Sequence, residues 1–199
     1  MERRHFIAGL SALTAGGLAS AGHAQGADEL ARIDGYMNAM RSARGSFIQF
    51  NSDGSRSSGQ YYLDKPGRMR FEYAAPHPHI IVADGTWVAV VDRNSNDTPA
   101  QYPVSQTPLN LILRDRVNLA GSGAIQRVVK SGSSTTLHAI DPSEPGSGRI
   151  ELVFDENPLA LREWTTVNPQ GQRTQIRLTS MEQNVDLSRR LFSIQAARG

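Results

Sequence analysis

Hydrophobic and polar positions alternate along most of this chain with the two-residue period of β-strands. In the clearest run, residues 68–73, the apolar side chains Met69, Phe71 and Tyr73 fall on one face and charged side chains fall on the other. The runs of this kind are residues 46–51, 59–64, 68–73, 79–83, 86–92, 125–130, 135–140, 149–155, 161–168 and 173–183. Residues 191–194 are expected to add a strand that closes the sheet. Because short turns separate the runs, the pattern predicts one antiparallel sheet, and about ten strands must curl or close.

Two segments have helical spacing instead. Within residues 28–41, apolar side chains recur at every third or fourth position up to Met40, and Gly45 is expected to stop this helix. Further along, Thr107 and Pro108 are residue types that begin a helix. The apolar residues of this second helix are Leu109, Leu111, Ile112 and Leu113. Two helices are too few to cover both faces of the sheet, so we expect them to cover one concave face or to plug one opening.

The first 24 residues have the pattern of an export signal. Arg3 and Arg4 precede a short apolar run, and small residues before Gln25 predict cleavage after Ala24. The paired arginines before Phe6 resemble a twin-arginine signal, with the general secretory route as the alternative. The mature chain, residues 25–199, is therefore expected to be one domain in the periplasm or outside the cell.

Composition then limits the chemistry. The 199 residues are 39% hydrophobic and 20% charged, which is ordinary for a globular domain. A formal net charge of +2 without a basic block makes nucleic acid an unexpected partner. The absence of cysteine excludes disulfides, thiolate metal sites and a thiol nucleophile, and it argues against the lipid anchor of bacterial lipoproteins. We expect a freely diffusing monomer.

Catalytic and metal-binding patterns are weak. His77 and His79 form the best metal-like pair, but no third ligand stands near them in the sequence. Nucleophile-elbow, phosphate-loop and dinucleotide motifs are absent. A secreted hydrolase that uses a serine or a metal-bound water near the two histidines is the weakest alternative. We expect a protein that is not an enzyme and that needs neither metal nor cofactor.

The segment 63–76, LDKPGRMRFEYAAP, has a more specific pattern: an apolar strand, a basic residue before proline, an aromatic-rich strand and a turn that ends in proline. It resembles the LolA family, the periplasmic carriers of outer-membrane lipoproteins. Further matches follow in the family's order: 47–50 with its F-x-Q strand, 81–87 with a hairpin whose Trp stands one place early here, 107–113 with its central helix, and 186–192 with its closing segment. Together they cover nearly all of the mature chain.

The resemblance implies a mainly β fold with helices (α+β), in which a helical lid covers a curled, incomplete antiparallel barrel, a half-barrel. It implies that acyl chains of lipoproteins lie in a hydrophobic cavity between sheet and lid. The carrier would take cargo from an inner-membrane lipoprotein-releasing ABC transporter and pass it to an outer-membrane acceptor, either a LolB-like protein or the membrane itself. The candidate cavity residues are Met69, Phe71, Tyr73, Trp87, Leu109, Ile112 and Leu113.

Lys65 matches the basic residue, usually arginine, with which the family latches the lid to the barrel. Lysine can donate to helix carbonyls but lacks the guanidinium fork, so Arg68 and Arg70 are candidates to share the role. The alternative for Lys65 is a solvated charge at a strand end, and the alternative for Met69 and Phe71 is plain core packing. A second function also stays open, a periplasmic lipid-binding sensor or interaction module on the same half-barrel.

Overall fold

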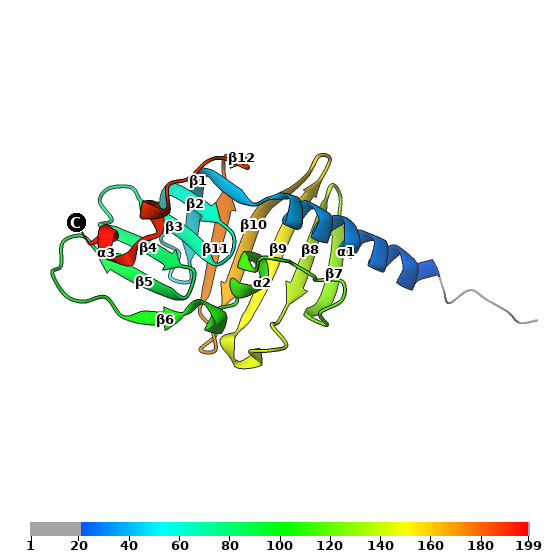
Figure 1. Cartoon of the computed structure of the whole chain (residues 1–199). Coiled ribbons are helices and arrows are strands. Elements are labelled where there is room, and N and C mark those ends of the chain that lie inside the picture. The colour runs from blue at the N-terminus through cyan, green and yellow to red at the C-terminus, as the bar shows by residue number, and fades with distance from the viewer. Residues whose placement is uncertain (1–20, 199) are drawn as a thin grey trace, which may run out of the picture.

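One antiparallel sheet curls around helices in the computed structural model, which describes residues 21–198 (Figure 1). The strands are β1 (Ser42–Asn51), β2 (Arg56–Asp64), β3 (Arg68–Tyr73), β4 (His79–Asp84), β5 (Trp87–Asp92), β6 (Gln101–Pro103), β7 (Ile125–Ser131), β8 (Ser134–Ala139), β9 (Arg149–Glu156), β10 (Leu159–Val167), β11 (Arg173–Leu178) and β12 (Glu182–Gln183). Their order is β6-β5-β4-β3-β2-β1-β11-β10-β9-β8-β7, and β12 pairs with β1. Within the described residues no pairing joins the outer strands β6 and β7, so the barrel is incomplete.

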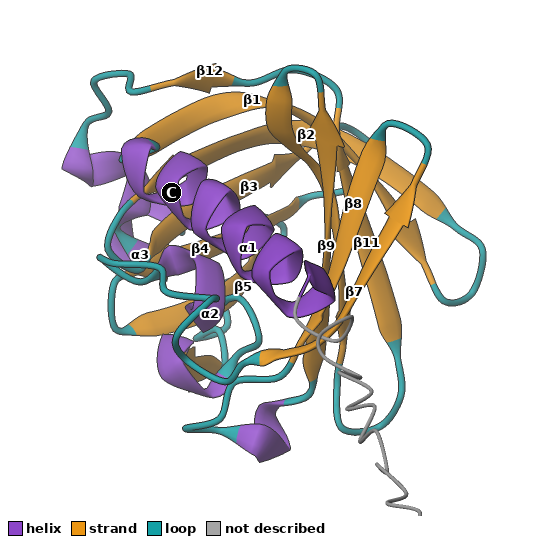
Figure 2. Ribbon diagram, turned by 90° about the vertical axis from the view of Figure 1, so that its right-hand side faces the viewer, coloured by secondary structure: helices purple, strands orange, loops and turns teal. Residues whose placement is uncertain are grey.

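The helices are few, and α1 (Ala21–Ala39) and α2 (Asn110–Leu113) lie on the concave side of the sheet (Figure 2). The others are α3 (Ile194–Ala197) and three 3-10 helices, η1 (Val104–Gln106), η2 (Pro145–Ser147) and η3 (Arg189–Phe192). Figure 2 shows α1 lying across the concave face, with α2 beside it. Among residues 21–198, no helix combines the length and the hydropathy that crossing a bilayer requires. The predicted signal residues Arg3 and Arg4 lie outside the described residues, and Ala24 falls within α1.

Apolar side chains from the concave face and from α1 form the main core. Ile33 and Met37 of α1 are fully buried against the sheet, where Phe47, Phe71 and Leu152 are buried as well. Burying a side chain of this size stabilises the fold by about 1.5–3 kcal/mol, and this drives the sheet to curl over the helix. The period-two pattern that predicted β3 is confirmed, because its apolar face points into this core.

A smaller core lies on the convex side of the sheet. There the C-terminal helix α3 packs on Ile80 and Val82 of β4 and on Ala89 and Val91 of β5. The prediction of a closing strand at 191–194 is therefore wrong. Short helices form instead, because serine hydroxyls cap both of them: Ser188 accepts from the backbone N–H of Arg190, and Ser193 accepts from that of Ala196.

The other differences from the sequence prediction lie at segment ends. Gly45 does not stop the first helix, since α1 ends at Ala39 and Gly45 lies inside β1. A Cβ at Gly45 would stand 2.0 Å from the carbonyl oxygen of Ser180, so glycine is needed there for the close approach of another segment. The prediction also missed β6, a three-residue edge strand that contains a proline.

The start of the second helix was misplaced as well. Leu109, not Thr107, occupies the N-cap position of α2. The Thr107 hydroxyl instead donates to the carbonyl oxygen of Val104 at 2.8 Å and so completes the preceding turn η1. Threonine satisfies whichever backbone group its turn brings within reach, and here that group lies upstream.

Candidate functional site

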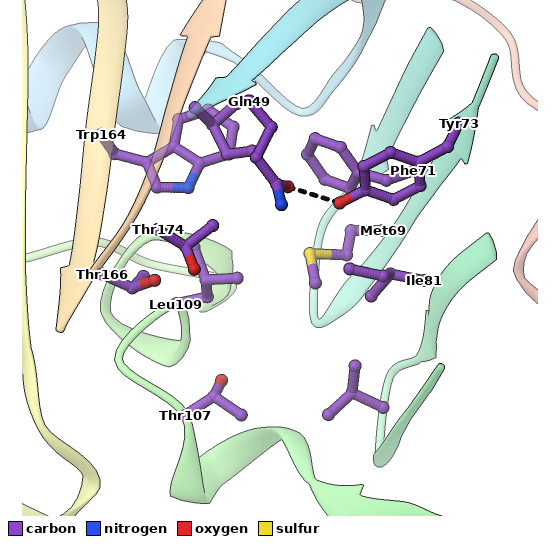
Figure 3. A pocket seen from close by; sticks show the side chains of 12 residues that line it. Gln49, Met69, Phe71, Tyr73, Ile81, Thr107, Leu109, Trp164, Thr166 and Thr174 are labelled. Carbon is purple, nitrogen blue, oxygen red and sulfur yellow. Dashed lines mark hydrogen bonds between the residues drawn. The ribbon is translucent and has the colours of Figure 1, made fainter. Parts of the chain in front are cut away.

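A cavity of about 230 Å³ opens between the concave face of the sheet and the segment that leads into α2 (Figure 3). Residues 104–113, which contain η1 and α2, are called the lid segment below. The lining is mostly apolar and comes from β1, β3, β4, β5, β10, β11 and the lid segment. The lining residues are Gln49, Met69, Phe71, Tyr73, Ile81, Val88, Thr107, Leu109, Trp164, Thr166, Thr174 and Ile176.

Aromatic side chains form one wall of this cavity. The Phe71 ring makes edge contacts with Phe47 and Trp164, at centroid distances of 4.9 Å and 6.0 Å, and lies 6.0 Å from the ring of Tyr61. Three of these rings come from the neighbouring strands β1, β2 and β3, and Trp164 comes from β10, which β11 separates from β1. Such contacts hold a rigid apolar surface against which a hydrocarbon chain can pack.

A second, more polar cavity of about 240 Å³ adjoins the first and shares Gln49, Tyr73 and Ile81 with it. The Tyr73 hydroxyl donates to Gln49 Oε1 at 2.5 Å, as Figure 3 shows at the edge of the apolar cavity. Burial raises the pKa of Tyr73 to about 12, so this hydroxyl keeps its proton near neutral pH. The remaining residues of the polar cavity are Asn51, Ser57, His77, His79 and Val90.

His77 and His79 do meet at this second cavity. Within the described residues, however, no group of three histidine, aspartate or glutamate side chains is arranged to hold a metal ion. A zinc site usually requires three or four protein ligands. The arrangement therefore gives the hydrolase alternative no support from metal chemistry.

Lys65 connects the barrel to α1. Its ammonium Nζ donates to the carbonyl oxygen of Met37 at 2.5 Å, and only 6% of the residue is exposed. This carbonyl belongs to the last turn of α1, and the next helical donor, the N–H of Arg41, bonds to Asn184 Oδ1 instead. Lys65 thus caps an otherwise unused carbonyl at the negative end of the helix.

Burial lowers the pKa of Lys65 to about 8, the nearby Arg41 guanidinium acts in the same direction, and Asp115 opposes both. The alternative of a solvated strand-end charge does not fit this position, because the side chain is buried and bonded to the helix.

Two residues of α1, and Arg41 just after it, join this helix to the chain that follows α2. Asp34 accepts from the N–H groups of Leu119 and Ala120 at 2.7 and 3.0 Å. Asn38 both donates to the carbonyl and accepts from the N–H of Val117, each at 2.8 Å. Arg41, just after the helix, donates to the backbone and the carboxylate of Asp115.

The other half of α1 is joined to the sheet by ion pairs. Glu29 accepts from Lys130 Nζ on β7 at 2.8 Å, and Arg32 pairs with both Glu29 and Glu156. Burial alone would raise the pKa of Glu29, but the hydrogen bonds from Lys130 and Arg32 outweigh it and lower that pKa. With both halves joined to neighbouring segments, α1 is firmly attached to the half-barrel.

The lid segment is held by a different set of contacts. The backbone N–H of Gly67 donates to the carbonyl oxygen of Leu113 at 2.8 Å. Asp141, whose carboxylate is wholly buried, accepts from Asn110 at 3.0 Å and pairs with Arg114. These bonds and the buried side chains of α2 set where Leu109 lines the cavity, beside Thr166 and Thr174 in Figure 3.

The structure brings four of the seven candidate cavity residues together: Met69, Phe71, Tyr73 and Leu109 all line the apolar cavity. Ile112 and Leu113, at the end of the lid segment, are buried in the main core and do not line the cavity. Trp87 lies elsewhere, with 42% of its surface exposed at the start of β5.

The position of Trp87 follows from the one-place shift in its hairpin. Successive residues of a strand point to opposite faces, so a tryptophan one place early leaves the concave face. Val88 takes the inward position beside the cavity instead.

Arg68 and Arg70, the candidate substitutes for the latch, do not reach α1 or α2. They alternate with Met69 and Phe71 and so lie on the convex side of β3. Arg68 pairs with Asp64 at 2.8 Å. Arg70 donates to the carbonyl oxygen of Leu191 at 2.9 Å and thereby holds the C-terminal segment.

Sequence reasoning missed several lining residues. Among them, Gln49 is the glutamine of the F-x-Q strand, and this motif could have identified it. Thr166 and Thr174 are paired across β10 and β11, and nothing in the sequence distinguishes them from other strand threonines.

The family model and the curated relatives agree on one family. The family model described as outer membrane lipoprotein carrier protein LolA matches residues 38–195. The outer-membrane lipoprotein carrier protein of Pseudomonas aeruginosa (strain UCBPP-PA14) is 25% identical over 194 residues, covering 91% of this chain and 90% of that protein. That of Legionella pneumophila (strain Corby) is 27% identical over 191 residues, covering 84% and 85%. A DUF1329 family protein from Desulfovibrio piger shares the fold, with a TM-score of 0.51 at 11% identity over 87% of this chain and 98% of that one.

Proposed function

We propose, because this chain belongs to the LolA family of outer-membrane lipoprotein carriers, that it binds the acyl chains of lipoproteins in the apolar cavity beneath the lid segment. The observation that carries the proposal is the cavity itself, which joins an aromatic wall from the sheet to Leu109 from the lid segment. The proposed role is binding and transfer, without a chemical step. Such a role explains why apolar side chains line a cavity instead of filling it.

Acyl chains need a carrier because water opposes their transfer. Each CH₂ group that leaves an apolar environment costs about 0.8 kcal/mol, so a lipoprotein with long chains does not leave a membrane unaided. A carrier must shield the chains and still release them. The mixed lining supports moderate binding, because Thr166 and Thr174 stand beside Met69 and Trp164.

The size of the cavity supports a lid segment that moves when cargo enters. At about 230 Å³ it is smaller than the roughly 300–1,000 Å³ of typical small-molecule sites. An acylated lipoprotein needs more room than that. Displacement of Leu109 and the lid segment from the sheet would enlarge the cavity without breaking the strand ladder.

The proposed route runs through the periplasm. Residues 1–24, including Arg3, Arg4 and Ala24, would act as a cleaved signal, and residues 25–199 would form the carrier domain. The carrier would receive cargo from the inner-membrane lipoprotein-releasing ABC transporter and deliver it to an outer-membrane acceptor, a LolB-like protein or the membrane itself. Lys65 would act as the latch, since it holds α1 to the turn between β2 and β3.

The substitution Met69→Glu tests the carrier proposal. A carboxylate in the apolar cavity opposes acyl binding, so release of a lipoprotein from inner-membrane vesicles that contain the transporter is expected to fall strongly. Circular dichroism would verify the fold, and Trp87→Gln serves as the matched control because Trp87 lies outside the cavity. A folded Met69→Glu protein that releases lipoprotein as well as the control does would contradict the cavity assignment.

A further inference from the structure

The two adjoining cavities form a groove with an apolar end and a polar end. Gln49, Tyr73 and Ile81 belong to both cavities and mark the boundary between them. On one side of this boundary lie Met69 and Trp164, and on the other lie the polar residues of the second cavity. Lipid molecules have the same division into hydrocarbon and head.

A chain of hydrogen bonds orders the polar end. The Tyr73 hydroxyl donates to Gln49 Oε1, Gln49 Nε2 donates to Asn51 Oδ1 at 2.6 Å, and Asn51 Nδ2 donates to Ser55 Oγ at 2.8 Å. This chain fixes the Gln49 amide at the boundary and leaves its second N–H for another acceptor. Beside it stand Ser57 and His79, whose side chains take part in none of the hydrogen bonds among residues 21–198.

The polar end carries no permanent charge. Among the described residues that line it, none has a carboxylate, an ammonium or a guanidinium group. An anionic or cationic head placed there would lose hydration without gaining a permanent opposite charge, which is unfavourable. An uncharged acceptor needs only donors, and the Gln49 amide, the Ser57 hydroxyl and the His79 imidazole can supply them.

We propose that this polar end binds the uncharged ester group that joins an acyl chain to glycerol, with the chain itself directed into the apolar end. The proposal rests on the carrier function and adds to it the part of the cargo that sets its position. Burial of the hydrocarbon would supply most of the affinity. Hydrogen bonds to the ester carbonyl would fix how deeply the chain enters.

Two matched probes isolate the carbonyl. Monododecanoylglycerol and the monododecyl ether of glycerol have the same head hydroxyls and similar chain lengths, but only the first has a carbonyl oxygen. Each would displace a fluorescent apolar dye from the purified protein, and dodecanoate would serve as the charged probe. We expect the ester to bind about 2- to 10-fold more tightly than the ether, the ratio that one neutral hydrogen bond supplies, and dodecanoate to bind more weakly than the ester.

Paired variants locate the effect. The double substitution Ser57→Ala with His79→Leu removes two of the three donors and is expected to reduce the ester preference while ether binding persists. The polar pair Ser57→Thr with His79→Gln is expected to restore it. Thr166→Val, which changes only the apolar end, is expected to leave the ratio unchanged.

Three outcomes would overturn the proposal. Equal binding of ester and ether by the unmodified protein would do so, as would an ester preference that the double substitution leaves undiminished. Tightest binding of dodecanoate would show that the polar end selects an anionic head. If none of the three probes displaced the dye, the carrier function would fail with it, so failure of the two proposals can be told apart.

Discussion

Replacing Lys65 with methionine is expected to remove its hydrogen bond to α1 without destabilising the protein near neutral pH. Methionine keeps the buried apolar stem and lacks the ammonium. Burial lowers the pKa of Lys65 from 10.5 to about 8. One pKa unit corresponds to about 1.4 kcal/mol, so the charged form is disfavoured in the folded protein by about 3 kcal/mol. The substitution removes this penalty, while an unpaired Met37 carbonyl costs about 1–3 kcal/mol. The net change should lie between zero and a gain of about 2 kcal/mol.

The lowered pKa of Lys65 also fixes the direction in which stability changes with pH. The unfolded chain keeps the Lys65 proton up to about pH 10.5, whereas the folded chain releases it near pH 8. Between these values the unfolded state binds more protons, so the stability of the unmodified protein rises with pH. From pH 7 to about pH 9.5 the gain from this group is about 2 kcal/mol. The Lys65→Met protein lacks the gain.

Urea unfolding of both proteins at the two pH values measures the effect. Groups common to both proteins, including the buried tyrosines, cancel in the comparison. The unmodified protein should become more stable relative to Lys65→Met by about 2 kcal/mol as the pH rises. If the difference between the two proteins stayed the same at both pH values, Lys65 would not be a buried ammonium with a lowered pKa, and the argument for the latch geometry would fail.

Two further changes test other parts of the structure. Trp164 lines the apolar cavity and Trp87 does not. Binding of monododecanoylglycerol should therefore change the tryptophan fluorescence of the Trp87→Phe protein and leave that of the Trp164→Phe protein unchanged. The reverse result would place the ligand elsewhere. Asn38→Ala removes both hydrogen-bond partners of the Val117 backbone, so urea titration should show a free energy of unfolding lower by about 1–3 kcal/mol. The control substitution Asp28→Ala, at an exposed position, should have little effect. Equal losses would contradict the assigned role of Asn38.

Much of the sheet could be predicted from the sequence because strand periodicity is local. Each alternating run needs only its own residues to show which face is apolar, and the runs predicted at residues 68–73 and 79–83 became β3 (Arg68–Tyr73) and β4 (His79–Asp84). The misplaced features depend on distant partners. Gly45 is required because the Ser180 carbonyl approaches it, and α1 ends early because Arg41 bonds to Asn184. Nothing near residue 45 in the sequence shows these contacts.

In the candidate site, too, some residues could be predicted from local pattern and others could not. Met69, Phe71 and Tyr73 could be predicted because one strand carries all three on its inner face. Trp87 was misplaced because a shift of one residue along a strand moves a side chain to the opposite face of the sheet. The assignment followed the family pattern instead of the alternation of inward and outward positions in β5. The burial of Lys65 could not be predicted from local pattern alone, since the helix that covers it begins about forty residues upstream and its depth depends on tertiary packing.

The contacts of the turn at residues 65–67 connect the latch to the cavity. The Lys65 side chain of this turn donates a hydrogen bond to α1, and the Gly67 backbone N–H donates one to Leu113 of α2. Of the helical parts, only the lid segment lines the apolar cavity, through Thr107 and Leu109, while α1 contributes no lining residue among those described. Moving α1 alone would therefore not admit a ligand, and moving the lid segment would.

On this reasoning α1 is a fixed support for the turn at residues 65–67, and this turn positions the lid segment. Loss of the Lys65 contact should loosen the bond between Gly67 and Leu113, so hydrogen exchange at the Gly67 amide should be faster in Lys65→Met than in the unmodified protein. An unchanged exchange rate there would show that the lid segment is held independently of α1.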